Sequence, residues 1–102
     1  MSAELQVLED FAPYVGEDFV LPGDESGEHL PIAFRLIEAT ELKNGYPGQK
    51  RLPFQLIFRV ATQVIFEQGG YLLTHPELGE RVVFMVPSGQ SAEGTEYCAT
   101  FN

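Results

Sequence analysis

The sequence predicts a single small domain of mainly β structure, an antiparallel six-stranded barrel or sandwich with one short N-terminal helix. Apolar and polar residues alternate along several short segments, which is the period of a strand with one buried face. Turns rich in glycine and proline separate these segments, and no connection contains a second helix long enough for a parallel crossover. The 102 residues are enough for one hydrophobic core, so residues 1–102 are predicted to form one β-domain.

The first element is predicted to be a helix over residues 3–12. Ser2 is a suitable N-cap, and Glu4 stands in the first turn, where the helix dipole favours an acid. Pro13 and Gly16 then end the segment. The apolar residues recur at helical spacing on one face: Leu5, Leu8, Phe11 and Ala12.

The rest of the chain is predicted to form strands and turns. After Leu36 the apolar residues continue on the opposite parity, so a β-bulge is predicted near residues 36–38. The predicted strands cover residues 18–22, 30–40, 53–60, 70–74, 80–87 and 95–102. The side chains predicted to face inward are Phe19, Leu21, Ile32, Phe34, Leu36, Phe54, Leu56, Phe58, Tyr71, Leu73, Val82, Phe84, Val86, Tyr97 and Phe101.

Two turns in the second half of the chain define its hairpins. In His75-Pro76-Glu77-Leu78-Gly79, Pro76 suits the second position of a type I turn and Gly79 can take a positive φ. The imidazole of His75 is expected to bond a backbone group of this turn. The next strand is predicted to stop at Pro87, with a polar turn over Ser88–Gly94.

The charge balance excludes several classes of partner. The chain has 15 acidic and 6 basic residues, a net charge of −9, which a phosphate-rich surface would repel. We therefore expect no nucleic-acid binding and no membrane binding. All of this net charge falls in residues 1–41, so the electrostatic field of the domain is expected to be uneven, with an acidic first part and a neutral second part. That field either steers a basic partner or keeps the chain soluble.

The compartment is predicted to be the cytoplasm. Cys98 is the single cysteine of the sequence, which excludes an internal disulfide and fits a reducing environment. Met1–Glu4 has neither the basic start nor the apolar stretch of a secretion signal. No apolar run approaches the length of a transmembrane helix.

Residues that could carry chemistry are sparse, so the sequence predicts no enzyme, no metal and no cofactor. His75 lacks the clustered ligands of a zinc site, and no histidine can be placed beside Cys98 as an activating base. Asp24–Glu28 lacks the ligand alternation of an EF-hand loop. A glycine-rich loop carries Lys43, Lys50 and Arg51, and it is either a solvated loop or a site for a small anion or an acidic partner residue.

The chain resembles, over nearly its whole length, an uncharacterised bacterial family of all-β proteins of similar length. The resemblance is carried by Gln68–Gly79, by Val83–Pro87 and by the ending Tyr97–Asn102, which match the patterns Q-G-x-Y-x-L-x-H-P-x-L-G, F-L-V-P-x-G and Y-x-A-x-F-N. Met85 in place of leucine departs from these patterns. The family implies no catalytic residue. It implies an association with phage-tail-collar-like fibre proteins.

The leading functional hypothesis is a non-enzymatic protein-interaction or assembly module. An open sheet edge is expected to pair with another protein, a tail-collar-like fibre protein or a second copy of the chain. The residues predicted to make this contact are Lys50, Arg51, Tyr97, Phe101 and Asn102. The alternative is a small-ligand-binding barrel, or an enzyme, whose pocket would use Lys50, Arg51 and His75.

Overall fold

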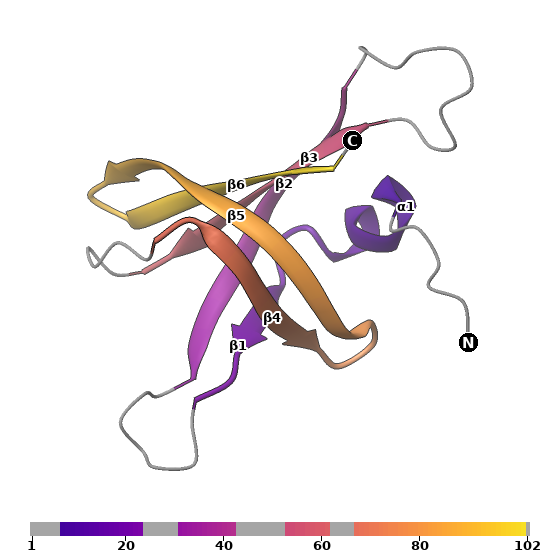
Figure 1. Cartoon of the computed structure of the whole chain (residues 1–102), viewed down its shortest axis with the longest axis horizontal. Helices are drawn as coiled ribbons and strands as arrows, with labels where there is room; N and C mark the ends of the chain where they lie inside the picture. The colour runs from indigo at the N-terminus through magenta and orange to yellow at the C-terminus, as the bar shows by residue number, and fades with distance from the viewer. Residues whose placement is uncertain (1–6, 24–30, 43–52, 62–66, 102) are drawn as a thin grey trace.

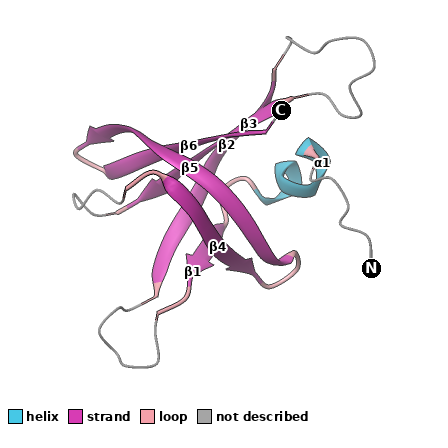
Figure 2. Cartoon of the chain, in the orientation of Figure 1, coloured by secondary structure: helices cyan, strands magenta, loops and turns pink. Residues whose placement is uncertain are grey.

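The computed structural model is a closed six-stranded antiparallel barrel with strand order β1-β2-β3-β6-β5-β4. It describes residues 7–23, 31–42, 53–61 and 67–101. Figures 1 and 2 show the strands curving around one another, with a short helix beside them. The strands are β1 Asp18–Leu21, β2 Ile32–Glu41, β3 Phe54–Val60, β4 Gly69–His75, β5 Gly79–Ser91 and β6 Gly94–Phe101. The prediction of a barrel or sandwich is confirmed, and the sheet closes.

The predicted bulge in β2 is present. Leu36 pairs with Phe58, and Glu38 then pairs with Ile57, so two steps along β2 match one step along β3. The extra residue returns the apolar side chains of β2 to the interior. Phe34 and Leu36 are buried before the bulge, and Ala39 packs against the core after it.

The β4–β5 hairpin turns as predicted, but β5 is longer than predicted. His75 pairs with Gly79, whose φ of 75° lies in the region that glycine adopts without strain. β5 then continues through Pro87 to Ser91, because a register shift between Pro87 and Gly89 accommodates the proline within the strand. The predicted polar turn over Ser88–Gly94 is therefore wrong, and only Ala92 and Glu93 lie outside the strands.

The core is rich in phenylalanine, as predicted, but the predicted orientation of β5 is wrong. Val82, Phe84 and Val86 were expected inside and are exposed, whereas Val83 and Met85 are fully buried. Cross-strand partners share a face of the sheet, and Val83 pairs with the inward-facing Tyr71 of β4. The buried apolar residues are Phe11, Phe19, Phe34, Leu36, Phe54, Leu56, Phe58, Val60, Leu73, Val83, Met85, Tyr97 and Ala99.

The N-terminal helix is shorter than predicted. α1 covers Leu8–Phe11, and a 3₁₀ helix over Ala12–Tyr14 follows it. Val7 has an extended backbone, and its N–H donates to Asp10 Oδ2 at 3.2 Å, which fixes the start of the helix after residue 7. Residues 3–6 of the predicted helix lie outside the described residues.

The helix closes one end of the barrel with a single aromatic side chain. Phe11 is fully buried, and its ring centroid lies 6.1 Å from that of Phe19, 6.1 Å from that of Phe54 and 5.8 Å from that of Phe101. The ring of Phe101 also stacks on that of Phe54, with the two centroids 4.5 Å apart. Figure 1 shows α1 beside the C-terminal end of β6. A helix of this length is held by such packing rather than by its own hydrogen bonds.

Closure of the barrel pairs much of the last strand on both sides. β6 pairs with β3 from Thr95 to Phe101 and with β5 from Gly94 to Cys98. Among the described cross-strand pairs, Ala99–Phe101 have partners on β3 alone, so the edge contact expected for the last strand stays a prediction. β1 and β4 close the barrel, with Val20 and Thr74 as cross-strand partners. The Thr74 hydroxyl donates to the carbonyl oxygen of Val20 at 3.3 Å and reinforces this contact.

Candidate functional site

The most distinctive surface feature is an apolar patch on the outside of the β4–β5 hairpin. Four side chains form this β4–β5 apolar face: Leu72, Val82, Phe84 and Val86, which are 41%, 62%, 58% and 40% exposed. The three residues of β5 are alternate residues of one strand, so their side chains point to the same side of the sheet. Each lies about 7 Å from the next along the strand. The face is therefore a continuous row of side chains.

The strand register extends this row onto neighbouring strands. Leu72 is the cross-strand partner of Val82, and the half-exposed Cys98 of β6 is the partner of Val86. The partner of Phe84 is Gly70, which has no side chain. Single exposed apolar residues are common on monomers, whereas contiguous apolar patches are typical of interaction surfaces. The β4–β5 apolar face is such a contiguous arrangement.

The surroundings of the apolar face are acidic. Glu67, Glu77 and Glu80 are exposed in and around the hairpin. The one basic residue between positions 67 and 87 is Arg81, which alternates with Val82 and so lies on the inward parity of β5. The outer surface of the hairpin thus combines apolar side chains with negative charge.

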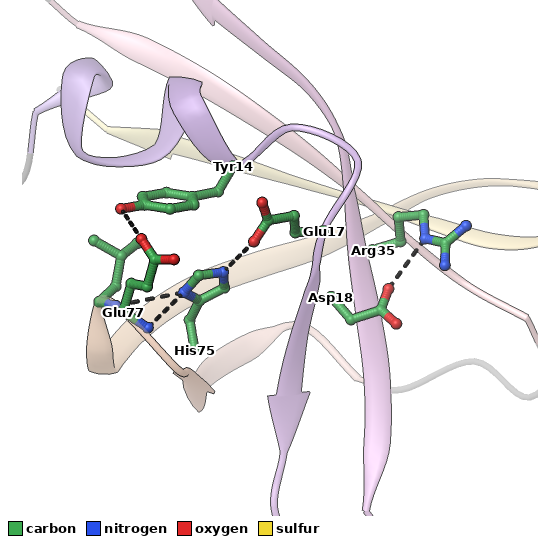
Figure 3. A network of polar contacts seen from close by, with 7 residues as sticks. Tyr14, Glu17, Asp18, Arg35, His75 and Glu77 are labelled. Atoms are coloured by element: carbon green, nitrogen blue, oxygen red, sulfur yellow. Dashed lines mark hydrogen bonds and ion pairs between the residues drawn. The ribbon is translucent and has the colours of Figure 1, made fainter.

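A second cluster is built around His75, at the junction of β4 and β1 (Figure 3). The imidazole is buried, and its Nδ1 accepts hydrogen bonds from the backbone N–H groups of Glu77 at 3.1 Å and Leu78 at 3.4 Å. The bond to the turn predicted from sequence is thereby confirmed. Since Nδ1 is an acceptor, the proton is on Nε2, which donates to Glu17 Oε1 at 2.8 Å.

Tyr14 covers the His75 ring and joins the same cluster. Its ring centroid lies 4.6 Å from that of His75, and its hydroxyl donates to Glu77 Oε2 at 3.0 Å. This hydrogen bond to a carboxylate raises the pKa of Tyr14 above 10.0, and desolvation and the charges of Glu77 and Glu17 raise it further. The cluster therefore links the 3₁₀ helix, the start of β1 and the β4–β5 turn.

The His75 cluster has the geometry of a structural contact rather than of a catalytic centre. Both ring nitrogens are already engaged, and their partners are the carboxylate of Glu17 and two backbone N–H groups rather than a nucleophilic side chain. No group of three or more potential metal ligands is found in the part of the chain that the structure describes. No helix among those residues is long and apolar enough to cross a membrane.

Four charged residues form a row across four strands on the other side of the barrel. Asp18, Arg35, Arg59 and Glu96 are successive cross-strand partners on β1, β2, β3 and β6. Arg35 Nε lies 3.1 Å from Asp18 Oδ1, and Arg59 Nη2 lies 3.0 Å from Glu96 Oε2. Arg59 Nη1 also reaches Glu93 Oε2 at 2.7 Å. Each arginine is thus paired with a carboxylate of the same chain.

This charge row borders an open groove of about 390 Å³, which also contacts Ala33 and Ala61. The carboxylates compensate the two arginines, so the groove has no net positive charge to attract an anion. The row was missed in the sequence because strand register, not residue type, brings these four residues together. The alternation in the sequence indicates that these side chains face outward, but it does not say which residues of neighbouring strands lie opposite one another.

The structure describes two of the five residues predicted to contact a partner. Tyr97 is fully buried in the core, so its ring is not part of the outer surface, and Phe101 is half-buried against Phe54. Lys50, Arg51 and Asn102 lie outside the described residues. The predicted convergence of Lys50, Arg51 and His75 on one pocket therefore stays a prediction, and the engaged ring nitrogens of His75 give it no support.

One known protein family matches nearly the whole barrel. A family model described as a domain of unknown function, DUF6916, matches residues 7–101. The chain belongs to the DUF6916 family. The expectation of an uncharacterised family is thereby confirmed. No curated protein and no solved structure matches the chain.

Both features of the hairpin belong to the DUF6916 domain. The matched residues include the entire β4–β5 hairpin, with its apolar face and with His75 in its turn. They also include Tyr14 and Glu17, which hold the turn against β1. The His75 cluster therefore fixes the hairpin, and the hairpin presents the apolar face.

Proposed function

We propose that this DUF6916 chain is a non-enzymatic protein-interaction module that binds its partner through the β4–β5 apolar face. The observation that carries the proposal is the contiguous row formed by Leu72, Val82, Phe84 and Val86 on the outside of a closed barrel. Complete burial of a fully exposed side chain of this kind contributes about 1.5–3 kcal/mol, and these four are 40–62% exposed, so a partner that covers the row gains about half of that from each.

The mode of contact differs from the strand pairing expected from the sequence. We place the contact on side chains that project from the sheet, whereas the sequence led us to expect backbone groups at a strand edge. The hairpin is a rigid base for such a contact, because the buried Val83 and Met85 anchor it from the inside. Exposed apolar residues on a fixed strand bind with little loss of conformational entropy.

The context of the interaction is also part of the proposal. A tail-collar-like fibre protein, which the resemblance implies, and a second copy of this chain are the first partners to test. The cytoplasm is the proposed compartment, since the half-exposed thiol of Cys98 stays reduced there. Assembly, rather than catalysis, is the proposed role.

A photo-crosslinking experiment tests the proposed function. p-Benzoylphenylalanine replaces Phe84 in one variant and Val15 in another, because Val15 is 46% exposed and lies outside the β4–β5 apolar face. We expect one defined partner to crosslink from position 84 and not from position 15. The partner is identified by mass spectrometry, purified and mixed with wild-type protein and with Phe84→Ser.

Binding of the purified partner by the wild type and its loss in Phe84→Ser are the expected results. Light scattering of the pure protein measures self-association in parallel. Equal crosslinking from positions 84 and 15, or unchanged binding by Phe84→Ser, overturns the proposed function.

A further inference from the structure

We infer that the partner is a basic segment with an apolar row, one of whose side chains enters the space above Gly70 beside Phe84. The inference rests on the proposed function and deepens it, because it specifies the chemistry of the partner. Two independent observations carry it. One is the position of a glycine in the middle of the apolar face, and the other is the charge around that face.

Gly70 leaves a notch in the β4–β5 apolar face. It is exposed, and its cross-strand neighbour is Phe84. A Cβ at position 70 would have one neighbour within 4 Å, Val82 Cγ1 at 3.6 Å, which is an ordinary van der Waals contact. The described glycines with positive φ are Gly16, Gly79 and Gly94, and Gly70 is not among them.

Neither backbone conformation nor crowding within the barrel therefore requires a glycine at position 70. A glycine inside a strand lowers stability relative to a β-branched residue, and it often marks a place where another molecule approaches closely. The ring of Phe84 remains 58% exposed, so it does not close the notch. A notch bordered by Phe84 and Val82 fits an aliphatic or aromatic side chain of a partner.

The charge around the face selects a basic partner. Glu67 and Glu80 are exposed near the two ends of the row. Arg81, the one basic residue of this segment, lies on the inward parity. Lysine or arginine residues that flank an apolar row on the partner would face these carboxylates and speed association at low salt.

The same charge disfavours two other occupants. A second copy of the chain would bring two bodies of charge −9 together and oppose the same glutamates across the interface. An anionic membrane surface would be repelled in the same way. A basic protein segment is the occupant that satisfies both the apolar row and the acidic border.

Two synthetic amphipathic peptides test the inference. Both carry the same leucine face, and the remaining positions are lysine in one peptide and glutamate in the other. Titration calorimetry measures their binding to the full chain and to the variants Phe84→Ser, Gly70→Thr, Glu80→Lys and Val15→Ser. Gly70→Thr fills the notch, and threonine favours a strand, so its urea midpoint should equal or exceed that of the wild type.

We expect the lysine peptide to bind and the glutamate peptide not to bind. Phe84→Ser should weaken binding by about tenfold or more, and Gly70→Thr by about threefold or more. Glu80→Lys should weaken binding and reduce its salt dependence, and Val15→Ser should leave it unchanged. If Gly70→Thr fails to fold, Gly70→Ala repeats the test with a single methyl group.

Several results would overturn the inference. These are binding of neither peptide, equal binding of both, or lysine-peptide binding that Phe84→Ser and Gly70→Thr leave unchanged. A dimer in light scattering that Phe84→Ser disrupts, or Phe84-dependent binding to phosphatidylcholine vesicles, identifies a different occupant and also overturns it. The proposed function stands in these cases if photo-crosslinking from position 84 still yields its defined partner.

Discussion

Gly94 lies directly against the backbone of Val60 at the start of β6. A Cβ at position 94 would lie 2.0 Å from the carbonyl oxygen of Val60 and 2.9 Å from its carbonyl carbon, and the φ of Gly94 is 134°. Both the close approach and the backbone conformation require a glycine. This contact fixes the end of β3 against the turn that leads from β5 to β6.

Gly94→Ala is therefore expected to destabilise the barrel severely. Overpacking against backbone and strain at a positive φ each cost about 1–3 kcal/mol, so the free energy of unfolding should fall by several kcal/mol or the chain should fail to fold. Gly89→Ala is the matched control, since a Cβ at Gly89 meets no atom within 4 Å. Urea unfolding followed by circular dichroism measures both, and similar midpoints for the two variants would contradict the contact.

The orientation of β5 gives a second prediction, which separates the buried from the exposed apolar residues. Met85→Ala should lower the free energy of unfolding by about 2–5 kcal/mol, because it leaves a cavity in the core. Phe84→Ser should change it by less than about 1 kcal/mol, since the ring is already largely exposed. The opposite order of the two effects in urea unfolding would support the orientation predicted from sequence.

The error in β5 shows where sequence reasoning lacked information. Residues 82–86 are apolar on both parities, so alternation alone does not assign a face. The turn contained the missing signal: if His75 pairs with Gly79, then Tyr71 must pair with Val83. Tyr71 was correctly expected inside, which places Val83 inside and Phe84 outside. Local alternation assigned β3 correctly because its outward positions are mainly polar, with Gln55 and Arg59 on either side of Ile57.

The elements that depend on contacts distant in sequence were the hardest to predict. The bulge after Leu36 was predictable because the apolar parity changes there. The charge row of Asp18, Arg35, Arg59 and Glu96 was not, because it requires the register of four strands at once. Closure of the barrel was likewise not predictable, because no residue of β6 signals that this strand pairs with β5 as well as with β3.

The tautomer of His75 is a third prediction. With Nδ1 accepting from the N–H of Glu77 and Nε2 donating to Glu17, the neutral ring should be the Nε2–H form. Long-range nitrogen–proton NMR spectra distinguish the two forms, and a protonated Nδ1 at neutral pH would contradict the assignment.

The stability contributed by the His75 cluster follows from the same bonds. His75→Leu keeps an apolar side chain between Tyr14 and Phe19 but leaves the N–H groups of the turn without their acceptor. The free energy of unfolding should fall by about 1–3 kcal/mol. Glu17→Gln keeps an oxygen that accepts from Nε2 and should cost less than about 1 kcal/mol. Equal stability of His75→Leu and the wild type would show that the bonds to the turn are dispensable.

The phenol of Tyr14 gives the last prediction, a pH dependence with a defined sign. Its hydrogen bond to Glu77 raises its pKa in the folded state above 10.0, so folding favours the protonated phenol. The associated stabilisation is present below the unfolded pKa and is lost as the pH rises through the folded pKa. The absorbance change of phenolate, taken as the wild type minus Tyr14→Phe, reports this titration. Glu77→Gln removes the carboxylate charge and should lower the pKa of Tyr14, whereas an unchanged titration in Glu77→Gln would show that Tyr14 and Glu77 are not bonded in solution.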